Sequence, residues 1–246
     1  MAYPYLPKLG KSPAKHDRRT LQFSKYRTLP PVPAEVSWVT HLSRLGIMLN
    51  DTLGDCTCAA AGHMIQQWTT YSIGAPVIPP DPTILKAYED VGGYVPGDPS
   101  TDNGCAMLDV LNYWRKTGID SHTIHAYVQV NPKNLDEVRE AIYLFGNVYV
   151  GVNLPLTVQG APSWTVGTGP NAVPGSWGGH CIPAVAMSPE TITVITWGSL
   201  LKMSHNFLGQ YCDEMFAVLS LDWLGRNGTA PDGFNLTQLQ SDLAAL

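Results

Sequence analysis

The sequence predicts an α+β fold in which a helical N-terminal half packs on a C-terminal antiparallel sheet or barrel. Apolar residues recur with helical spacing up to about residue 145, and runs rich in β-branched residues follow. Helices followed by strands is the order typical of α+β folds. The 246 residues are 44% hydrophobic, enough for one large domain with a sizeable core. The 23 glycines and 20 prolines indicate many turns.

Residues 1–34 predict a basic, proline-rich arm. They carry seven bases against one acid, whereas the rest of the chain carries eight bases against nineteen acids. Such an arm can lie across its own body or a neighbouring subunit, can touch nucleic acid, or can be a solvated tail. The acidic body is not a nucleic-acid surface. A domain over 35–222 and a tail over 223–246, with a short helix after Gly233, complete the predicted organisation.

Helical patterns follow the arm. The predicted helices cover 56–73, 82–91, 105–117 and 133–145. Asp55 precedes the first of them as an N-cap, and alanines are dense within it. Gly118 and Gly146 end the last two, as glycine commonly ends helices. The second lies in a stretch rich in turn residues, between residues 74 and 103.

Strand patterns dominate beyond the last of these helices. The predicted strands cover 148–154, 180–187, 191–197 and 214–220. A loop rich in Gly, Pro and Trp spans 159–179. Asp213 and Glu214 are adjacent, and neighbouring residues of a strand face opposite sides. We therefore expect this acidic pair at the surface rather than in a site.

Membrane and secreted classes are not expected. No apolar stretch reaches the ~18 residues that a membrane span needs. The first residues lack the apolar run of a secretory signal, so we expect a cytoplasmic protein with no membrane partner. The five cysteines are an odd number, which favours reduced thiols over a disulfide framework.

Cys56 is the first candidate for chemistry. A cysteine in the first turn of a helix lies at the positive end of the helix dipole, which lowers its pKa and favours the thiolate. The alternative is a small buried apolar residue, as we expect for Cys58. His63 lies on the same helix face as Cys56 but about 10 Å along the axis, too far to act as its base. We expect His63 in the core or at its boundary.

His180 is the second candidate. It opens an apolar strand after a glycine-rich loop, where an imidazole can act as a base beside a thiolate. A core histidine with satisfied hydrogen bonds is an equal alternative. Trp197 could shield an ion pair from water, and Thr196 could accept a hydrogen bond from the imidazole.

The order of these motifs resembles that of the papain-like cysteine peptidases, from about Pro33 to Ser220. The matching stretches are Pro33–Trp38, Asn50, Gly54–Cys56, Asn103–Gly104, Gly118–Ile119, Val148–Leu154, His180–Val185 and Trp197–Gly198. The resemblance implies a papain-like fold in which a central Cys-bearing helix packs on the sheet. It also implies a Cys–His catalytic pair, an oxyanion role for Asn50, and a substrate-binding rim at Asn103 and Gly104. It implies neither a metal nor another cofactor.

The sequence departs from the pattern of this family. The imidazole-orienting asparagine is absent, and the two ways of counting place either Ile195 or Thr196 at its position; only the threonine could orient a histidine. Asn50 replaces a glutamine that is one methylene longer. Thr57 replaces the tryptophan that usually follows the cysteine. About thirty residues stand where the family has a long inhibitory propeptide.

Two functions remain open. In the enzymatic one, Cys56 attacks the amide carbonyl of a peptide-like substrate, His180 acts as base and then acid, and an acyl-enzyme forms. Trp164 and Trp177 of the 159–179 loop, together with Trp197, would then contact apolar or ring-bearing substrate groups.

In the alternative, a catalytically lapsed scaffold uses the arm and the tail to bind neighbouring subunits in an assembly. The sequence around Cys56 resembles that of bacterial and phage proteins, so that assembly could be a phage particle. Zinc held by Cys56, Cys58, His180 and Cys181 is disfavoured, because C-x-C at a helix start does not turn both sulfurs to one metal.

Overall fold

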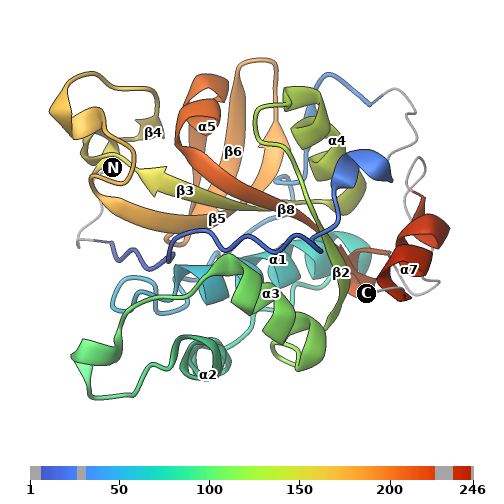
Figure 1. The fold of residues 1–246 in the computed structure, drawn as a ribbon, viewed down its shortest axis with the longest axis horizontal. Helices are drawn as coiled ribbons and strands as arrows, with labels where there is room; N and C mark the ends of the chain where they lie inside the picture. The colour runs from blue at the N-terminus through green and yellow to red at the C-terminus, as the bar shows by residue number, and fades with distance from the viewer. Residues whose placement is uncertain (1–6, 27–31, 225–234, 245–246) are drawn as a thin grey trace.

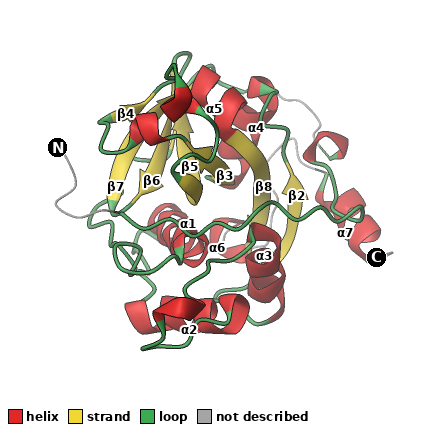
Figure 2. Cartoon of the chain, turned by 60° about the vertical axis from the view of Figure 1, so that its left-hand side comes forward, coloured by secondary structure: helices red, strands yellow, loops and turns green. Residues whose placement is uncertain are grey.

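A computed structural model describes residues 7–26, 32–224 and 235–244. These residues form an α+β fold, as predicted, with helices on both faces of a curved sheet (Figures 1 and 2). Helices α1 to α3 lie on one face, and α4 and α5 lie on the other (Figure 1). None of the described helices is long and apolar enough to cross a membrane.

The sheet has eight strands within the described residues. They are β1 (Val36–Ser37), β2 (Ile124–Gln129), β3 (Val148–Leu154), β4 (Ser163–Trp164), β5 (Gly178–Met187), β6 (Thr191–Thr196), β7 (Ser199–Ser204) and β8 (Cys212–Ser220). Their order is β2-β8-β3-β5-β6-β7-β4, and β1 pairs with β5. All pairs are antiparallel except β4 with β7. The four predicted strands are confirmed, whereas β1, β2, β4 and β7 were not predicted.

The helices match the sequence patterns closely. They are α1 (Cys56–Ser72), α2 (Asp81–Gly92), α3 (Met107–Lys116), α4 (Leu135–Phe145), α5 (His205–Tyr211), α6 (Leu221–Leu224) and α7 (Leu236–Ala244). The first four and the tail helix were predicted; α5 and α6 were not. Because β2 lies between α3 and α4, helices do not strictly precede strands.

Alternation along β3 divides the core into two parts. Val148, Val150 and Val152 contribute to the cluster beneath α4 and α5, whereas Tyr149 contributes to the cluster around α1. Helix α1 is buried from Cys56 through Thr70, because other elements cover it on all sides. It packs directly on β5, so the start of the helix and the start of that strand can share one site.

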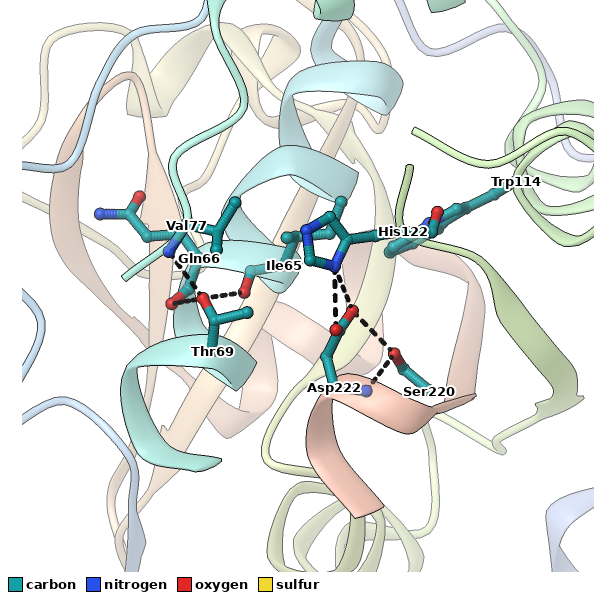
Figure 3. Close-up of polar contacts among 8 residues, drawn as sticks. All are labelled: Ile65, Gln66, Thr69, Val77, Trp114, His122, Ser220 and Asp222. Atoms are coloured by element: carbon teal, nitrogen blue, oxygen red, sulfur yellow. Dashed lines mark hydrogen bonds and ion pairs between the residues drawn. The ribbon is translucent and has the colours of Figure 1, made fainter. Parts of the chain in front are cut away.

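Polar contacts fix the corner between β2, α3 and α6, away from that site (Figure 3). The Nδ1 atom of His122 lies 2.8 Å from an Asp222 carboxylate oxygen, and this hydrogen bond raises the pKa of His122. The indole of Trp114 donates to the carbonyl of His122. At the other end of α1, the amide of Val77 donates to the Thr69 hydroxyl.

The arm lies on its own body over residues 7–26. Figure 1 shows it in blue, running between the sheet and the helices α1 and α3. Phe23 and Tyr26 are buried in the core, and the Tyr26 carbonyl accepts a hydrogen bond from the amide of Asn235, just before α7. The rest of the arm up to residue 31, and residues 225–234 and 245–246 of the tail, lie outside the described residues.

The expectation that the acidic pair lies at the surface was wrong. Glu214 is only 2% exposed, and Asp213 is partly buried. A register shift between β3 and β8 pairs Gly151 with Glu214 and Val152 with Cys212. Asp213 is therefore an extra residue between the two pairs, and strict alternation fails at this bulge. Both carboxylates approach the same lysine of the arm.

Candidate active site

Cys56 is the first residue of α1, as predicted, and its side chain is buried. Asp55 occupies the N-cap position, but its side chain makes no cap hydrogen bond to the helix. It instead accepts a hydrogen bond from Nδ2 of Asn50 at 3.1 Å. Burial raises the pKa of this carboxyl well above its usual value. Asp55, which precedes Cys56, is therefore buried and hydrogen-bonded to Asn50.

His180 lies at the start of β5, opposite Val152 of β3. Its Nε2 atom is 2.9 Å from the hydroxyl of Thr196, at the end of β6. Its Nδ1 atom is buried and has no hydrogen-bond partner among the described residues. Burial lowers the pKa of His180 to about 3, so the imidazole is neutral in this environment. Nε2 thus has a hydrogen-bond partner, whereas Nδ1 is available to bond another group.

Cys56 and His180 line the same cavity, together with Asn50, Thr196 and Trp197. Its volume is about 10 Å³, which is room for a single water molecule. The four residues predicted to be catalytic are thus brought together. Asn50 donates its amide hydrogens to Leu53 and Asp55, so an oxyanion role would require it to release one of them; that role stays a prediction.

Trp197 covers the imidazole. Its ring stacks on that of His180 with centroids 4.4 Å apart and planes 12° apart. Trp177 and Trp164 pack against Trp197 in turn. Trp164 is almost fully buried and its ring packs at 69° to that of His180, so it does not lie at a surface open to a ligand. A substrate contact by these indoles stays a prediction.

The arm is hydrogen-bonded to residues that line or flank this cavity. The amide of Lys11 donates to the carbonyl of Gly179, and the amide of Ser12 donates to the carbonyl of Cys105. The amide of Cys105 donates in return to the carbonyl of Gly10. These bonds join Lys11 to Cys105 as a parallel β-bridge. We call residues 8–12 the covering segment, because their backbone is bonded to residues around Cys56 and His180.

The N-terminal end of the covering segment is also tied down. The amide of Lys8 donates to the carbonyl of Asn50. The carbonyl of Lys8 accepts a hydrogen bond from the indole of Trp197 at 3.1 Å. The covering segment therefore contacts the residues that surround both Cys56 and His180.

Gly10 makes the closest approach. A Cβ atom at this position would lie 1.7 Å from the carbonyl oxygen of Gly54, so only glycine fits. Backbone hydrogen bonds from Cys181 and Gly10 reach the Cys56 thiol, yet burial dominates and raises its pKa to about 12. In this covered state the sulfur is a neutral thiol.

The predicted substrate rim lies beside the covering segment. The backbone of Gly104 packs so tightly on the Gly10 carbonyl that a Cβ would lie 1.8 Å from its oxygen. Gly104 donates its amide hydrogen to the hydroxyl of Tyr88, which donates to Asp102. The side chain of Asn103 is turned outward and donates to the carbonyl of Ser100. A substrate role for Asn103 and Gly104 stays a prediction.

Cys58 and His63 are packed as the sequence predicts. All five cysteines are free. Cys58 is buried against Cys105. His63 is buried, and burial lowers its pKa to about 4. Among the described residues, no three His, Cys, Asp or Glu side chains are grouped so that they could hold a metal ion.

Sequence reasoning missed the part that the arm plays at the site. Gly10 and Lys11 carry no motif, and a Gly-Lys pair between prolines is an ordinary loop pattern. The excess of positive charge in the arm opposite an acidic body was the available signal. It indicates attraction to the body but not the place of contact.

No protein-family model and no curated protein matches the sequence. Solved structures do match. Xylellain, a cysteine protease from Xylella fastidiosa, superimposes with a TM-score of 0.70 at 13% identity, covering 89% of this chain and 98% of that one. Procathepsin L 3 of the Tenebrio molitor larval midgut has a TM-score of 0.63 at 11% identity, covering 87% of this chain and 77% of that one.

A third solved structure is a cysteine protease of Carica candamarcensis in complex with E-64. Its TM-score is 0.56 at 11% identity, and the match covers 76% of this chain and 99% of that one. At these identities the likeness is one of fold. Together with the layered architecture and the helix that begins at Cys56, it shows that this chain has the fold of the papain-like cysteine proteases.

Proposed function

We propose that this protein is a cysteine peptidase that hydrolyses peptide bonds through Cys56 and His180. The observation that carries the proposal is the shared cavity: a cysteine at the start of a central helix and a histidine with one held and one unpartnered nitrogen line the same small space. The covering segment adds support, because it lies there as a hydrogen-bonded extended chain. A cleft that binds this stretch of peptide can bind another.

The residues suffice for acyl transfer. With Nε2–H donated to Thr196, Nδ1 of His180 is free to take the Cys56 proton. The thiolate adds to the carbonyl carbon, and the backbone amide of Cys56 and the side chain of Asn50 donate to the oxyanion. The C–N bond then breaks as His180 returns the proton to the leaving amine. Water, deprotonated by the same imidazole, hydrolyses the thioester and restores the thiol.

The covered state is inactive in this proposal. Burial favours the neutral forms of both the Cys56 thiol and the His180 imidazole. Release of the covering segment admits water, which moves both pKa values toward their usual range and allows a thiolate–imidazolium pair. The arm is thus an intramolecular occupant of the cleft that any substrate must displace.

A lapsed scaffold is the second candidate. It is favoured by the depth at which Cys56 and His180 are buried and by the threonine at the imidazole-orienting position. In that case the cleft holds the arm permanently. Function then lies in what the arm and tail bind, such as neighbouring subunits of an assembly, a phage particle among them.

The reactivity of Cys56 separates these candidates. The Gly10→Ala substitution places a Cβ against the Gly54 backbone and should expel the covering segment. Gly209→Ala is the matched control, because a Cβ there meets nothing within 4 Å. Each variant is labelled with limiting iodoacetamide at about pH 6, where an ordinary thiol with a pKa near 8.5 is almost wholly protonated. Intact mass and peptide mapping identify the labelled cysteine.

If the protein is a peptidase, Cys56 should be labelled at least about tenfold faster in the Gly10→Ala variant than in the wild type or the Gly209→Ala variant. Adding His180→Ala should abolish the gain at this pH, and Gly10→Ala should cleave a mixed fluorogenic peptide library. Labelling of Cys56 in Gly10→Ala at the rate of an ordinary thiol, with no cleavage, would establish the scaffold instead.

A further inference from the structure

Among the described lysines, only Lys11 has a fully buried side chain. The chemistry proposed for Cys56 and His180 does not use this side chain. Its ammonium Nζ lies 2.9 Å from an Asp213 carboxylate oxygen and 3.3 Å from Oε1 of Glu214. Burial alone would lower the pKa of Lys11, but these two carboxylates together raise it. The amine is thus a buried cation paired with two carboxylates.

The pocket is shaped for a long side chain. A Cβ at Gly151 would lie 2.3 Å from Cε of Lys11 and 2.7 Å from the sulfur of Met107. Glycine at this position of β3 therefore leaves the space that the lysine stem fills. Asn153, on the same strand, orients Asp213 with a hydrogen bond of 3.1 Å. We call these five residues, Met107, Gly151, Asn153, Asp213 and Glu214, the lysine pocket.

The lysine pocket has more acceptors than Lys11 satisfies. Oε2 of Glu214 is buried without a hydrogen-bond partner, and so is Oδ1 of Asp213. When the covering segment leaves, both carboxylates lose the ammonium group that neutralises them. The emptied pocket then presents two adjacent carboxylates with unpartnered oxygens, and opposite charge favours another cation in place of Lys11.

We infer that the lysine pocket is a specificity site that selects peptides carrying a lysine or arginine side chain. This inference rests on the proposed function, in that the cleft must bind peptides other than the arm. The occupant enters as Lys11 does, with its backbone bonded to Gly179 and Cys105 and its basic side chain between Met107 and Gly151. A neutral side chain of equal length fills the same volume but leaves both carboxylates unpaired.

The test measures binding apart from catalysis. The full chain carries Gly10→Ala, to expel the covering segment, and Cys56→Ala, to prevent chemistry. Its ligands are the capped pentapeptide Leu-Gly-Lys-Ser-Pro, which copies residues 9–13, and the same peptide with arginine or norleucine at the central position. Norleucine keeps the stem and removes the charge. Affinities are measured by isothermal titration calorimetry at about pH 7 and low salt.

The inference predicts that the lysine and arginine peptides bind at least about tenfold more tightly than the norleucine peptide. Glu214→Gln should reduce this ratio to about threefold or less, and Asp213→Asn provides the same comparison should Glu214→Gln fail to fold. Glu190→Gln, an exposed carboxylate in the β5–β6 turn, should leave the ratio unchanged.

Equal affinity for the lysine and norleucine peptides would overturn the inference. So would absence of lysine-peptide binding, or a ratio that Glu214→Gln and Asp213→Asn leave intact. The proposed function fails separately, through an unreactive Cys56. Selective binding by a chain whose Cys56 is inert would therefore retain the lysine pocket and discard the peptidase.

Discussion

At the candidate site, a threonine hydroxyl contacts the imidazole of His180. The resemblance to papain-like peptidases left either Ile195 or Thr196 at the imidazole-orienting position, and the structure puts the Thr196 hydroxyl 2.9 Å from Nε2 of His180. Both residues line the cavity, but only the threonine offers a polar atom. This contact holds one ring nitrogen and leaves Nδ1 available, so we treat Thr196 as a positioning residue.

The Thr196→Val substitution tests that assignment. Valine keeps the shape but leaves Nε2 of a buried histidine without a partner, a loss of about 1–3 kcal/mol in the free energy of unfolding. In the Gly10→Ala background we expect labelling of Cys56 to slow below about pH 7 and to follow an ordinary thiol pKa. Thr196→Ser, which retains the hydroxyl, should restore the wild-type pH profile. An unchanged profile in Thr196→Val would show that the hydroxyl does not orient the imidazole.

At the scale of elements, the arm is bonded to the residues around the candidate site. Four backbone hydrogen bonds join residues 8–12 to the residues around Cys56 and His180, and Lys11 fills the pocket below. Farther along the arm, Lys15 pairs with Asp109 at the surface. The two lysines contribute unequally, because charge pairs at the surface are screened by solvent while buried ones are not.

Lys11→Met and Lys15→Met make a matched pair. Lys11→Met leaves the carboxylates of Asp213 and Glu214 without their cation, and we expect a loss of about 3 kcal/mol in the free energy of unfolding or a release of the arm. Lys15→Met removes a pair that is mostly exposed and should change stability by no more than about 0.5 kcal/mol. Urea unfolding measures both. Equal effects of the two substitutions would mean that the buried pair does not anchor the arm.

At the scale of the whole molecule, buried histidines couple folding to pH. Burial lowers the pKa of His180 to about 3 and that of His63 to about 4. In the unfolded chain both take up protons near pH 6.5. The folded state therefore loses stability as the pH falls below about 6.5, until the folded pKa is reached. Asp55 acts in the opposite direction, because burial raises the pKa of its carboxyl.

His63→Gln isolates one of these contributions. Relative to this variant, the wild type should lose up to about 1.4 kcal/mol of unfolding free energy per pH unit between about pH 6.5 and 4. Glutamine is uncharged at every pH. The difference in unfolding free energy between the two proteins therefore reports the proton that His63 binds in the unfolded chain but not in the folded one. Urea midpoints at half-unit steps of pH measure it. Parallel pH curves for both proteins would mean that His63 accepts its proton in the folded state.

The sequence determined the elements whose patterns are local. The helix from Cys56, the strand from Val148 and the glycine-ended helices follow from apolar spacing and end signals within a dozen residues. The sequence patterns did not predict helix α5, because it is a short helix of seven residues between two strands. The candidate pair Cys56 and His180 was also readable, since each stands at the start of its own element.

Only the tertiary structure decided what surrounds that pair. The bulge that turns Asp213 and Glu214 toward one lysine depends on how β8 pairs with β3, and this register is set by strands more than fifty residues apart. The place of the arm depends on the close approach of Gly10 to Gly54 and on the space at Gly151. Such fits arise between segments distant in sequence, so the sequence determined the candidate pair while three-dimensional packing decided that the chain's own arm lies against it.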